Sequence, residues 1–444
     1  MVTALSIPSD PERSQPTWVL IGSALLLVGG SLLMAPHGQL TDPLVLGRFW
    51  PAAAVMAGGF ALSWRLEAVG RWAFWGVALA ARLLLLPMEP SDDIWRYLWE
   101  GQIQLLGFNP FELPPADAAL AAWRPPWWAL INHPDVTAIY PPLTQLLFRL
   151  LALPGPSVLV FKLAFVAADL GVCALLVRRF GRRRSLLYGW NPLILVSFAG
   201  GGHFDSWFLL PLAAAWTLGP RQRLAAALLV GLSVAIKWIS LPMLAHQLWQ
   251  PLRARRWRQA LAMALLGLLP MAAASLAFCD RRRCALVPMG SSFVRHGRSA
   301  ELVPHLVGRV WSWSVQHNGV FLLALAAVTL LLLGRRADLG RFSRRYLLAL
   351  LLLSPIVHVW YFSWLIPFGL PTRAWAERLV SLSGFVYFVL PSRLPDWQLS
   401  DAERLLLWGP LVAGLALEAL AAGGAPADDQ PDDRPDAPSP PERP

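Results

Sequence analysis

Two adjacent carboxylates open the most distinctive stretch of the sequence, SDDIWRYLWEG at residues 91–101. On a helix, Asp93, Arg96 and Tyr97 share one face because they are three and four residues apart, so a carboxylate, a cation and a phenol can converge. A carboxylate within reach of a hydroxyl can act as a general base, and a cation can stabilise a departing phosphate oxygen. The structural alternative is a helix start, where both acids only complement the positive end of the helix dipole.

A second group of polar residues lies in a stretch rich in proline and aromatic residues. Asn109, His133 and Tyr140 belong to it, and its prolines and rings predict an ordered, stiff loop. Taken singly, each of these three residues is also typical of turn punctuation.

His203 and Asp205 follow three glycines in the segment GGGHFDSW. Their place at an interrupted helix predicts contact with a sugar or its phosphate. As a metal site the pair is incomplete, because two ligands are too few and a third would have to come from Asp92 or His133. A divalent cation is therefore left open as a cofactor.

Three further sites place polar groups beside apolar runs. Inserting an ammonium such as that of Lys237 into an apolar run costs about 2.5–3.5 kcal/mol, and binding of a lipid phosphate would offset this cost. The alternative is that the Lys237 side chain snorkels toward the headgroups. His358 and Tyr361 lie in the run SPIVHVWYFSWLIP, where an interfacial aromatic belt is the alternative to ligand binding. Arg82 is a phosphate candidate too, unless it pairs with Asp169 of a neighbouring helix.

The elements that must position these residues are membrane helices. Hydrophobic residues make up 56% of the 444 positions and charged residues only 15%, so hydrocarbon is the solvent for most side chains. Repeated apolar stretches reach spanning length, at residues 17–35, 49–64, 72–88, 158–177, 259–278 and 320–333. We therefore predict an all-α, polytopic transmembrane helix bundle of about 12–14 helices over residues 1–424.

Short arginine clusters set the predicted orientation. The positive-inside rule places them in the cytoplasm, at residues 65–71, 178–184, 253–258 and 335–345. Because the arginines lie in these clusters, the formal charge of +11 does not indicate nucleic-acid binding. Residues 89–140 then form a large external loop, and the short apolar stretch 141–153 is predicted as a re-entrant or surface helix.

The ends of the chain and the cysteines complete this prediction. The polar start lacks the features of a cleavable signal, so we expect a retained first helix and both ends in the cytoplasm. Residues 425–444 are rich in Pro and Asp and are predicted to form a disordered tail. Cys279 and Cys284 lie in a loop placed outside the cytoplasm, where a disulfide can form, while Cys173 lies within an apolar stretch.

The order of motifs resembles that of a known enzyme class. SDDIWRYLWEG, FNPF, NHPDVTAIYPPL, GHFD, KW with a following proline, and SPIVHVWYFSWLIP are similar to motifs of multispanning glycosyltransferases of the GT-C fold, above all bacterial mannosyltransferase-like members of family 87. Such families keep an acid at the start of the first large external loop as the base for the acceptor hydroxyl. Asp93 matches that acid, and Asp92 is then a helper or an optional metal ligand. Two helices precede the helix that leads into the loop, where many GT-C members have none.

The resemblance implies a transferase in the cell membrane, inner or plasma, with an extracytoplasmic active site. It would pass a hexose, most simply mannose, from a polyprenyl-phosphate donor to a hydroxyl of a lipid or glycan acceptor, and direct displacement would invert the anomeric centre. Besides these substrates and membrane lipids, no nucleic acid is expected as a partner. Donor phosphate and sugar binding falls to Arg96, Tyr97, His203, Asp205, Lys237, His358 and Tyr361. The acceptor loop contributes Asn109, His133 and Tyr140.

Two other functions fit parts of the pattern. A transporter or flippase of a lipid-linked sugar would also have buried charges and broken helices, but the sequence shows no internal repeat. A ligase or polymerase that transfers whole glycans from lipid carriers differs in its substrate and not in its architecture. Soluble nucleotide-sugar enzymes are excluded, because no GxGxxG segment follows a strand.

Overall fold

The computed structural model describes residues 17–279, 284, 286 and 296–423, and this part of the chain is helical apart from one isolated parallel bridge, Ser299 with Ile356. The α-helices are α1 (Thr17–Met34), α2 (Pro43–Ser63), α3 (Arg71–Leu85), α4 (Asp93–Leu105), α5 (Pro142–Ala152), α6 (Val158–Gly189), α7 (Pro192–Leu195), α8 (Ser206–Thr217), α9 (Arg223–Ile236), α10 (Leu241–Arg253), α11 (Trp257–Ser275), α13 (Val303–Val310), α14 (Gly319–Gly334), α15 (Leu339–Leu353), α16 (Phe362–Gly369), α17 (Trp375–Ser383) and α18 (Asp401–Gly423). Short 3-10 turns are η1 (Ala118–Trp123), η2 (Pro126–Leu130), η4 (Pro220–Gln222), η5 (Trp238–Ser240), η6 (Ser312–Gln316), η7 (Val359–Tyr361), η8 (Gly384–Val389) and η9 (Pro391–Arg393), and η3 (Val196–Gly200) is a π-helix.

The predicted fold class, an all-α membrane bundle, is confirmed. Five helices in the described part are long and apolar enough to cross a membrane, namely α1, α2, α6, α11 and α18. Four shorter apolar helices accompany them, and the total of about 12–14 crossings stays a prediction. Exposed leucines on the outside of the bundle, such as Leu323 on α14 at 72% exposure, suit a surface that faces lipid tails and not water.

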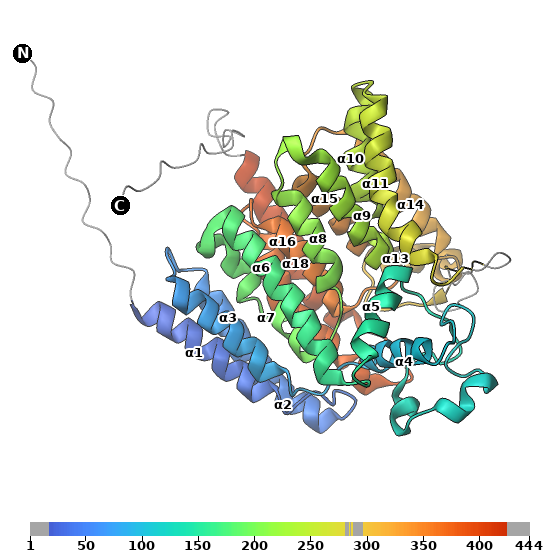
Figure 1. Cartoon of the computed structure of the whole chain (residues 1–444). Helices are drawn as coiled ribbons and strands as arrows, with labels where there is room; N and C mark the ends of the chain where they lie inside the picture. Colours follow the sequence, from blue (N-terminus) through green and yellow to red (C-terminus); the bar gives the residue numbers. More distant parts are fainter. Residues whose placement is uncertain (1–16, 280–283, 285, 287–295, 424–444) are drawn as a thin grey trace, which may run out of the picture.

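The arginine clusters neighbour one another in pairs. Arg182 donates to the carbonyl of Val69 at 2.8 Å, which joins the clusters at 178–184 and 65–71. Arg253 donates to the carbonyl of Gly334 at 3.1 Å, beside the cluster at 335–345. Figure 1 shows the turn between α10 and α11 at the end of the bundle opposite α4. This arrangement agrees with one basic end and one end that carries the acid motif.

Helix breaks occur where the sequence predicts them. The chain leaves α7 through the π-helix η3 and starts α8 only at Ser206, so the segment GGGHFD lies in the break. The residue Lys237 follows the last residue of α9 with an extended backbone, before η5. A further break at Gly181, which has a positive φ of 76°, divides α6. At the first two breaks, the polar side chains of His203, Asp205 and Lys237 face protein, as broken helices in a bilayer require. The arginines that follow Gly181 are exposed.

The helix α5 is a short wedge inside the bundle. Its eleven residues rise only about 16 Å, well under the roughly 30 Å hydrocarbon core, as predicted for this stretch. A Cβ at Gly101 of α4 would lie 2.5 Å from the carbonyl oxygen of Phe148, so glycine permits the close contact of α4 with α5. On the other side, the Thr144 hydroxyl donates to the carbonyl of Ile236 at 2.7 Å. The wedge therefore joins α4 to the end of α9.

The turn before α4 docks on the glycine segment. The backbone N–H of Ser91 donates to the carbonyl of Gly201 at 3.0 Å. Gly202 has a φ of +74°, and a Cβ there would lie 2.7 Å from the Cδ1 atom of Ile94. The Lys162 ammonium, buried in α6, donates to the carbonyls of Leu86 at 3.1 Å and Met88 at 2.5 Å. The acid motif is thus held against α6 and the 200–202 segment.

Arg82 makes the ion pair that was the alternative to phosphate binding. Its Nε and Nη2 atoms contact the two carboxylate oxygens of Asp169 at 2.5 and 3.1 Å, and both side chains are fully buried. Nη1 also donates to the carbonyls of Ala78 and Gly189. Because all three guanidinium nitrogens are engaged within the bundle, Arg82 links α3 to α6 and is not part of the acid site.

Cys279 and Cys284 form a disulfide, and Cys173 is a buried free thiol. The predicted tail at residues 425–444 and the polar start before α1 lie outside the described residues.

Replacing Arg82 with leucine would leave the carboxylate of Asp169 buried without a cation. We expect the free energy of unfolding to fall by about 3–5 kcal/mol, measured by thermal melting of the purified protein in detergent. As a control, Arg341→Leu removes a pair with Asp338 in which both side chains are about half exposed, and it should cost under about 1 kcal/mol. Equal destabilisation by the two variants would contradict the assignment of Arg82 as a core pair.

Candidate functional site

Asp93 is the centre of the polar cluster at the start of α4. Its Oδ1 atom accepts a hydrogen bond from the Asn132 amide at 2.7 Å. Its Oδ2 atom accepts one from the Tyr97 hydroxyl at 3.3 Å and lies 3.5 Å from Nδ1 of His203. Asp92 occupies the N-cap position but accepts no capping hydrogen bond. A simple helix start therefore does not account for the two acids.

The pKa values of the two carboxyl groups are shifted in opposite directions. Burial acts to raise the pKa of Asp93, but the nearby imidazole of His203, together with His358 and Asn132, outweighs it and holds that pKa well below its ordinary value. Although Asp92 reaches solvent, the loss of hydration within the surrounding protein and the repulsion by Asp93 raise its pKa to about 6. At neutral pH, Asp93 is therefore ionised and able to accept a proton.

Two imidazoles stack on one indole beside Asp93. The ring of Trp360 lies 3.6 Å from that of His203 and 4.5 Å from that of His358, centroid to centroid, and both pairs are nearly parallel. The Nδ1 atom of His358 lies 2.5 Å from the hydroxyl of Tyr387. Burial lowers the pKa of His358 to about 4 despite the opposing charge of Asp93, so this ring is neutral at pH 7.

Lys237 and Asp205 form an ion pair next to this stack. The Oδ1 atom of Asp205 also accepts a hydrogen bond from the Trp364 indole at 2.6 Å, while its Oδ2 atom is buried without a partner. The Lys237 ammonium lies 4.7 Å from the Trp364 ring and 5.5 Å from the Tyr361 ring, close enough for cation–π attraction. The pair with Asp205 and the rings compensate the buried ammonium and fix its position.

His203 and Asp205 face different partners, since His203 faces Asp93 and Asp205 faces Lys237. Among the described residues, no three His, Cys, Asp or Glu side chains lie close enough together to hold a metal ion. The two residues are thus parts of two polar pairs and do not form a shared ligand set.

Arg96 is near Asp93 in sequence, but its contacts indicate a different role from phosphate binding. Its Nε atom donates to Glu100 at 2.8 Å. Its two terminal nitrogens donate to backbone carbonyls of the external loop, those of Asn132, His133, Val136 and Thr137. With its donors turned to this loop, Arg96 holds the segment that carries Asn132, and so acts on Asp93 through Asn132.

The remaining loop residues are divided between two places. The Tyr140 ring lies 5.6 Å from the Tyr97 ring and 4.7 Å from the Phe204 ring, within the aromatic wall beside Asp93. His133 is exposed and has a positive φ of 43°, and its carbonyl is one of those that Arg96 holds. Asn109 bonds to Phe111 and to the carbonyl of Phe278 and thus ties the loop to the end of α11, away from the Asp93 cluster.

Four residues of the cluster are absent from the set that the sequence predicts, namely Asn132, Trp360, Trp364 and Tyr387. Asn132 directly precedes His133 in the motif NHPD, so that motif was its signal. Trp360 and Trp364 lie in the run that contains His358. No local pattern singles out Tyr387, which reaches His358 across 29 positions.

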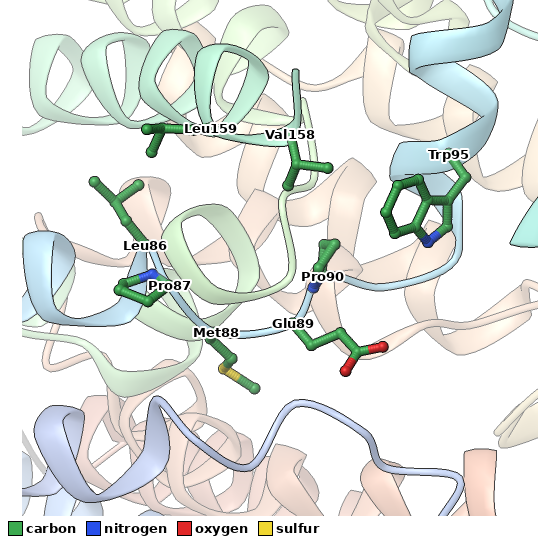
Figure 2. Close-up of a pocket in the computed structure, with 8 residues that line it drawn as sticks. All are labelled: Leu86, Pro87, Met88, Glu89, Pro90, Trp95, Val158 and Leu159. Atoms are coloured by element: carbon green, nitrogen blue, oxygen red, sulfur yellow. The ribbon is translucent and has the colours of Figure 1, made fainter. Parts of the chain in front are cut away.

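A groove of about 600 Å³ adjoins the acid motif along the chain. Its lining comes from the residues just before the motif, from one residue within it and from the start of α6, namely Leu86, Pro87, Met88, Glu89, Pro90, Trp95, Val158 and Leu159. Figure 2 shows Leu86, Pro87 and Leu159 together at one end and Trp95 at the other. The walls are mainly apolar, so the groove suits a hydrocarbon chain better than a free sugar.

Comparison with known proteins identifies one family. The model of glycosyltransferase family 87 matches residues 138–355. The match covers Tyr140, His203, Asp205 and Lys237, and it ends shortly before His358. No curated protein and no solved structure matches the chain.

Arg96→Lys tests whether the guanidinium holds the loop. A lysine ammonium cannot reach four carbonyls from one fork, so we expect faster amide hydrogen exchange at residues 132–137. The matched control is Arg124→Lys, because Arg124 donates to the carbonyls of Ala116 and Asp117 in another part of the same loop. Unchanged exchange at 132–137 in the Arg96 variant would contradict the positioning role.

Proposed function

We propose that this chain, of which residues 138–355 match the model of glycosyltransferase family 87, is a membrane glycosyltransferase that transfers a hexose from a polyprenyl-phosphate donor to an acceptor hydroxyl. The proposed sugar is mannose, and the proposed site of action is the extracytoplasmic face of the cell membrane. The observation that carries the proposal is the ionised carboxylate of Asp93, held by Asn132, Tyr97 and His203 at the mouth of the bundle.

In the proposed reaction, Asp93 accepts the proton of the acceptor hydroxyl as the oxygen attacks the anomeric carbon. The bond from that carbon to the phosphate oxygen breaks, and the electron pair leaves with the lipid phosphate. Attack opposite the leaving group inverts the anomeric centre. Holding the hydroxyl and the carboxylate together makes the proton transfer effectively intramolecular.

We assign the departing phosphate to Lys237 and His358. Only one contact of the Lys237 ammonium to a carboxylate is made in the described part, to Asp205, and an ammonium carries three donors. His358 is neutral at pH 7, and we assign it the tautomer in which Nδ1 accepts from the hydroxyl of Tyr387, so that the proton on Nε2 can be donated to a phosphate oxygen. One charge and one neutral donor would thus meet the charge that develops on the lipid phosphate.

The remaining predicted donor residues take supporting roles in this proposal. Tyr97 orients Asp93 through its hydroxyl, and Tyr361 flanks the Lys237 ammonium with its ring. We propose Arg96 as a positioning residue of the loop and not as a phosphate ligand. We assign the prenyl chain of the donor to the apolar groove in Figure 2.

Asp93→Asn removes the base while it keeps the shape of the side chain. We expect kcat to fall by about 10²-fold or more, the usual contribution of a general base, and expect a smaller loss for Asp92→Asn. The measurement is transfer of labelled mannose from polyprenyl phosphate to a panel of lipid and glycan acceptors. A normal rate for Asp93→Asn would exclude Asp93 as the base, and translocation of lipid without transfer by either protein would favour a flippase.

Leu159→Asp places a charge in the wall of the groove. We expect the KM for a long-chain polyprenyl donor to rise about tenfold, since one leucine side chain contributes about 1.5–3 kcal/mol of apolar contact. Leu163→Asp is the matched control, because Leu163 lies one turn further along α6, is also exposed and does not line the groove. A donor with a short prenyl chain should show the same KM in all three proteins, and an equal rise in both variants with the long-chain donor would refute the assignment.

A further inference from the structure

The proposed reaction leaves one proton to be placed. A sugar phosphodiester with one negative charge becomes a lipid phosphate monoester with two, and the acceptor hydroxyl loses its proton. Asp93 takes this proton first. Its carboxylate is surrounded by groups that favour the ionised form, namely Asn132, Tyr97 and His203, so Asp93 is a poor place for the proton to stay.

The imidazole of His203 is the nearest group that can take the proton onward. Its Nδ1 atom faces Oδ2 of Asp93 at 3.5 Å and is buried without a hydrogen-bond partner. A formed ion pair would bring the two atoms to about 2.7–2.9 Å. At 3.5 Å the two groups are not joined in a closed ion pair, and a proton that moves to Nδ1 would draw them together.

We propose that His203 is the terminal proton acceptor of the transfer reaction and receives through Asp93 the proton that leaves the acceptor hydroxyl. This inference rests on the proposed function. The hydroxyl O–H bond breaks as the bond from oxygen to the anomeric carbon forms, and the proton passes to Asp93. It then passes to Nδ1 of His203, and Asp93 is again a carboxylate. The product state is an ion pair between Asp93 and an imidazolium.

Two observations favour His203 as the acceptor. Its ring lies 3.6 Å from that of Trp360 at an angle of 18°, and an indole face stabilises a cationic ring. The charge of a protonated His203 also has the required effect on Asp93, because it lowers the pKa of the carboxyl group and so keeps the proton on the imidazole.

The other titratable groups near His203 are less suited to the task. Asp92 is on α4 beside Asp93, His358 precedes η7, and each of them interacts electrostatically with His203. His358 faces Tyr387 with its Nδ1 atom, and its low pKa disfavours the protonated ring. Lys237 is paired as a cation with Asp205, so its ammonium group has no lone pair to accept a proton. Only His203 presents a free nitrogen to the carboxylate among these groups.

The test is the pH dependence of kcat in His203→Gln. A proton acceptor must be neutral before each turnover, so the proposal requires wild-type kcat to fall at acidic pH. We expect His203→Gln to lose about 10²-fold in kcat and to lose this acid limb, whereas Asp92→Asn keeps it. An acid limb that persists in His203→Gln would overturn the proposal. Loss of a basic limb instead would also overturn it, since His203 would then act as a fixed cation.

Trp360→Phe provides a second test if His203→Gln does not fold. A phenyl face stabilises an imidazolium less than an indole face does, so the acid limb should move to lower pH while the enzyme stays active. An unmoved limb would count against His203. Assay of Asp93→Asn alongside separates the two ideas, because its loss of transfer supports the proposed function whichever way the His203 profile falls.

Discussion

The contact between the turn before α4 and the glycine segment 200–202 is the constraint on which the site depends. The Ser91 amide bonds to the Gly201 carbonyl, and the left-handed Gly202 leaves room for Ile94. A side chain at Gly202 would push α4 away from the break before α8. Since Asp93 starts α4 and His203 directly follows the glycine segment, this contact sets the distance between carboxylate and imidazole.

The other elements extend this contact on two sides. On the membrane side, the buried ammonium of Lys162 holds the carbonyls of the turn, so a cation inside α6 serves the backbone and not a substrate. On the aqueous side, Arg96 gathers the external loop and presents Asn132 to Asp93. The α5 wedge joins α4 to the end of α9, which Lys237 directly follows. Broken helices thus bring charges from four chain segments to one place without a soluble domain.

The sequence predicts the fold class and the contact between Asp93 and Tyr97 because both depend on local patterns. Apolar runs and arginine clusters specify membrane helices, and the four-residue spacing of Asp93 and Tyr97 is seen as a hydrogen bond. Prediction is weakest where distant segments meet. Glu100 is close enough in sequence to be recognised as a partner of Arg96, but the loop carbonyls that Arg96 binds lie 36 to 41 positions away. From the sequence alone, the cation of Arg96 is therefore assigned to a phosphate. Tyr387 is set beside His358 only by the packing of η8, which no local pattern encodes.

The account requires that the carboxylate of the acid motif lies on the side of the membrane opposite the arginine clusters. The direct measurement is labelling of Asp92→Cys by a membrane-impermeant maleimide in intact cells, with Cys279 and Cys284 replaced by serine and with Cys173 left buried. Because Asp92 is exposed, we expect prompt labelling from outside, and a cysteine at Arg255 in the turn between α10 and α11 should react only after permeabilisation. Labelling of position 92 only in permeabilised cells would contradict an extracytoplasmic active site.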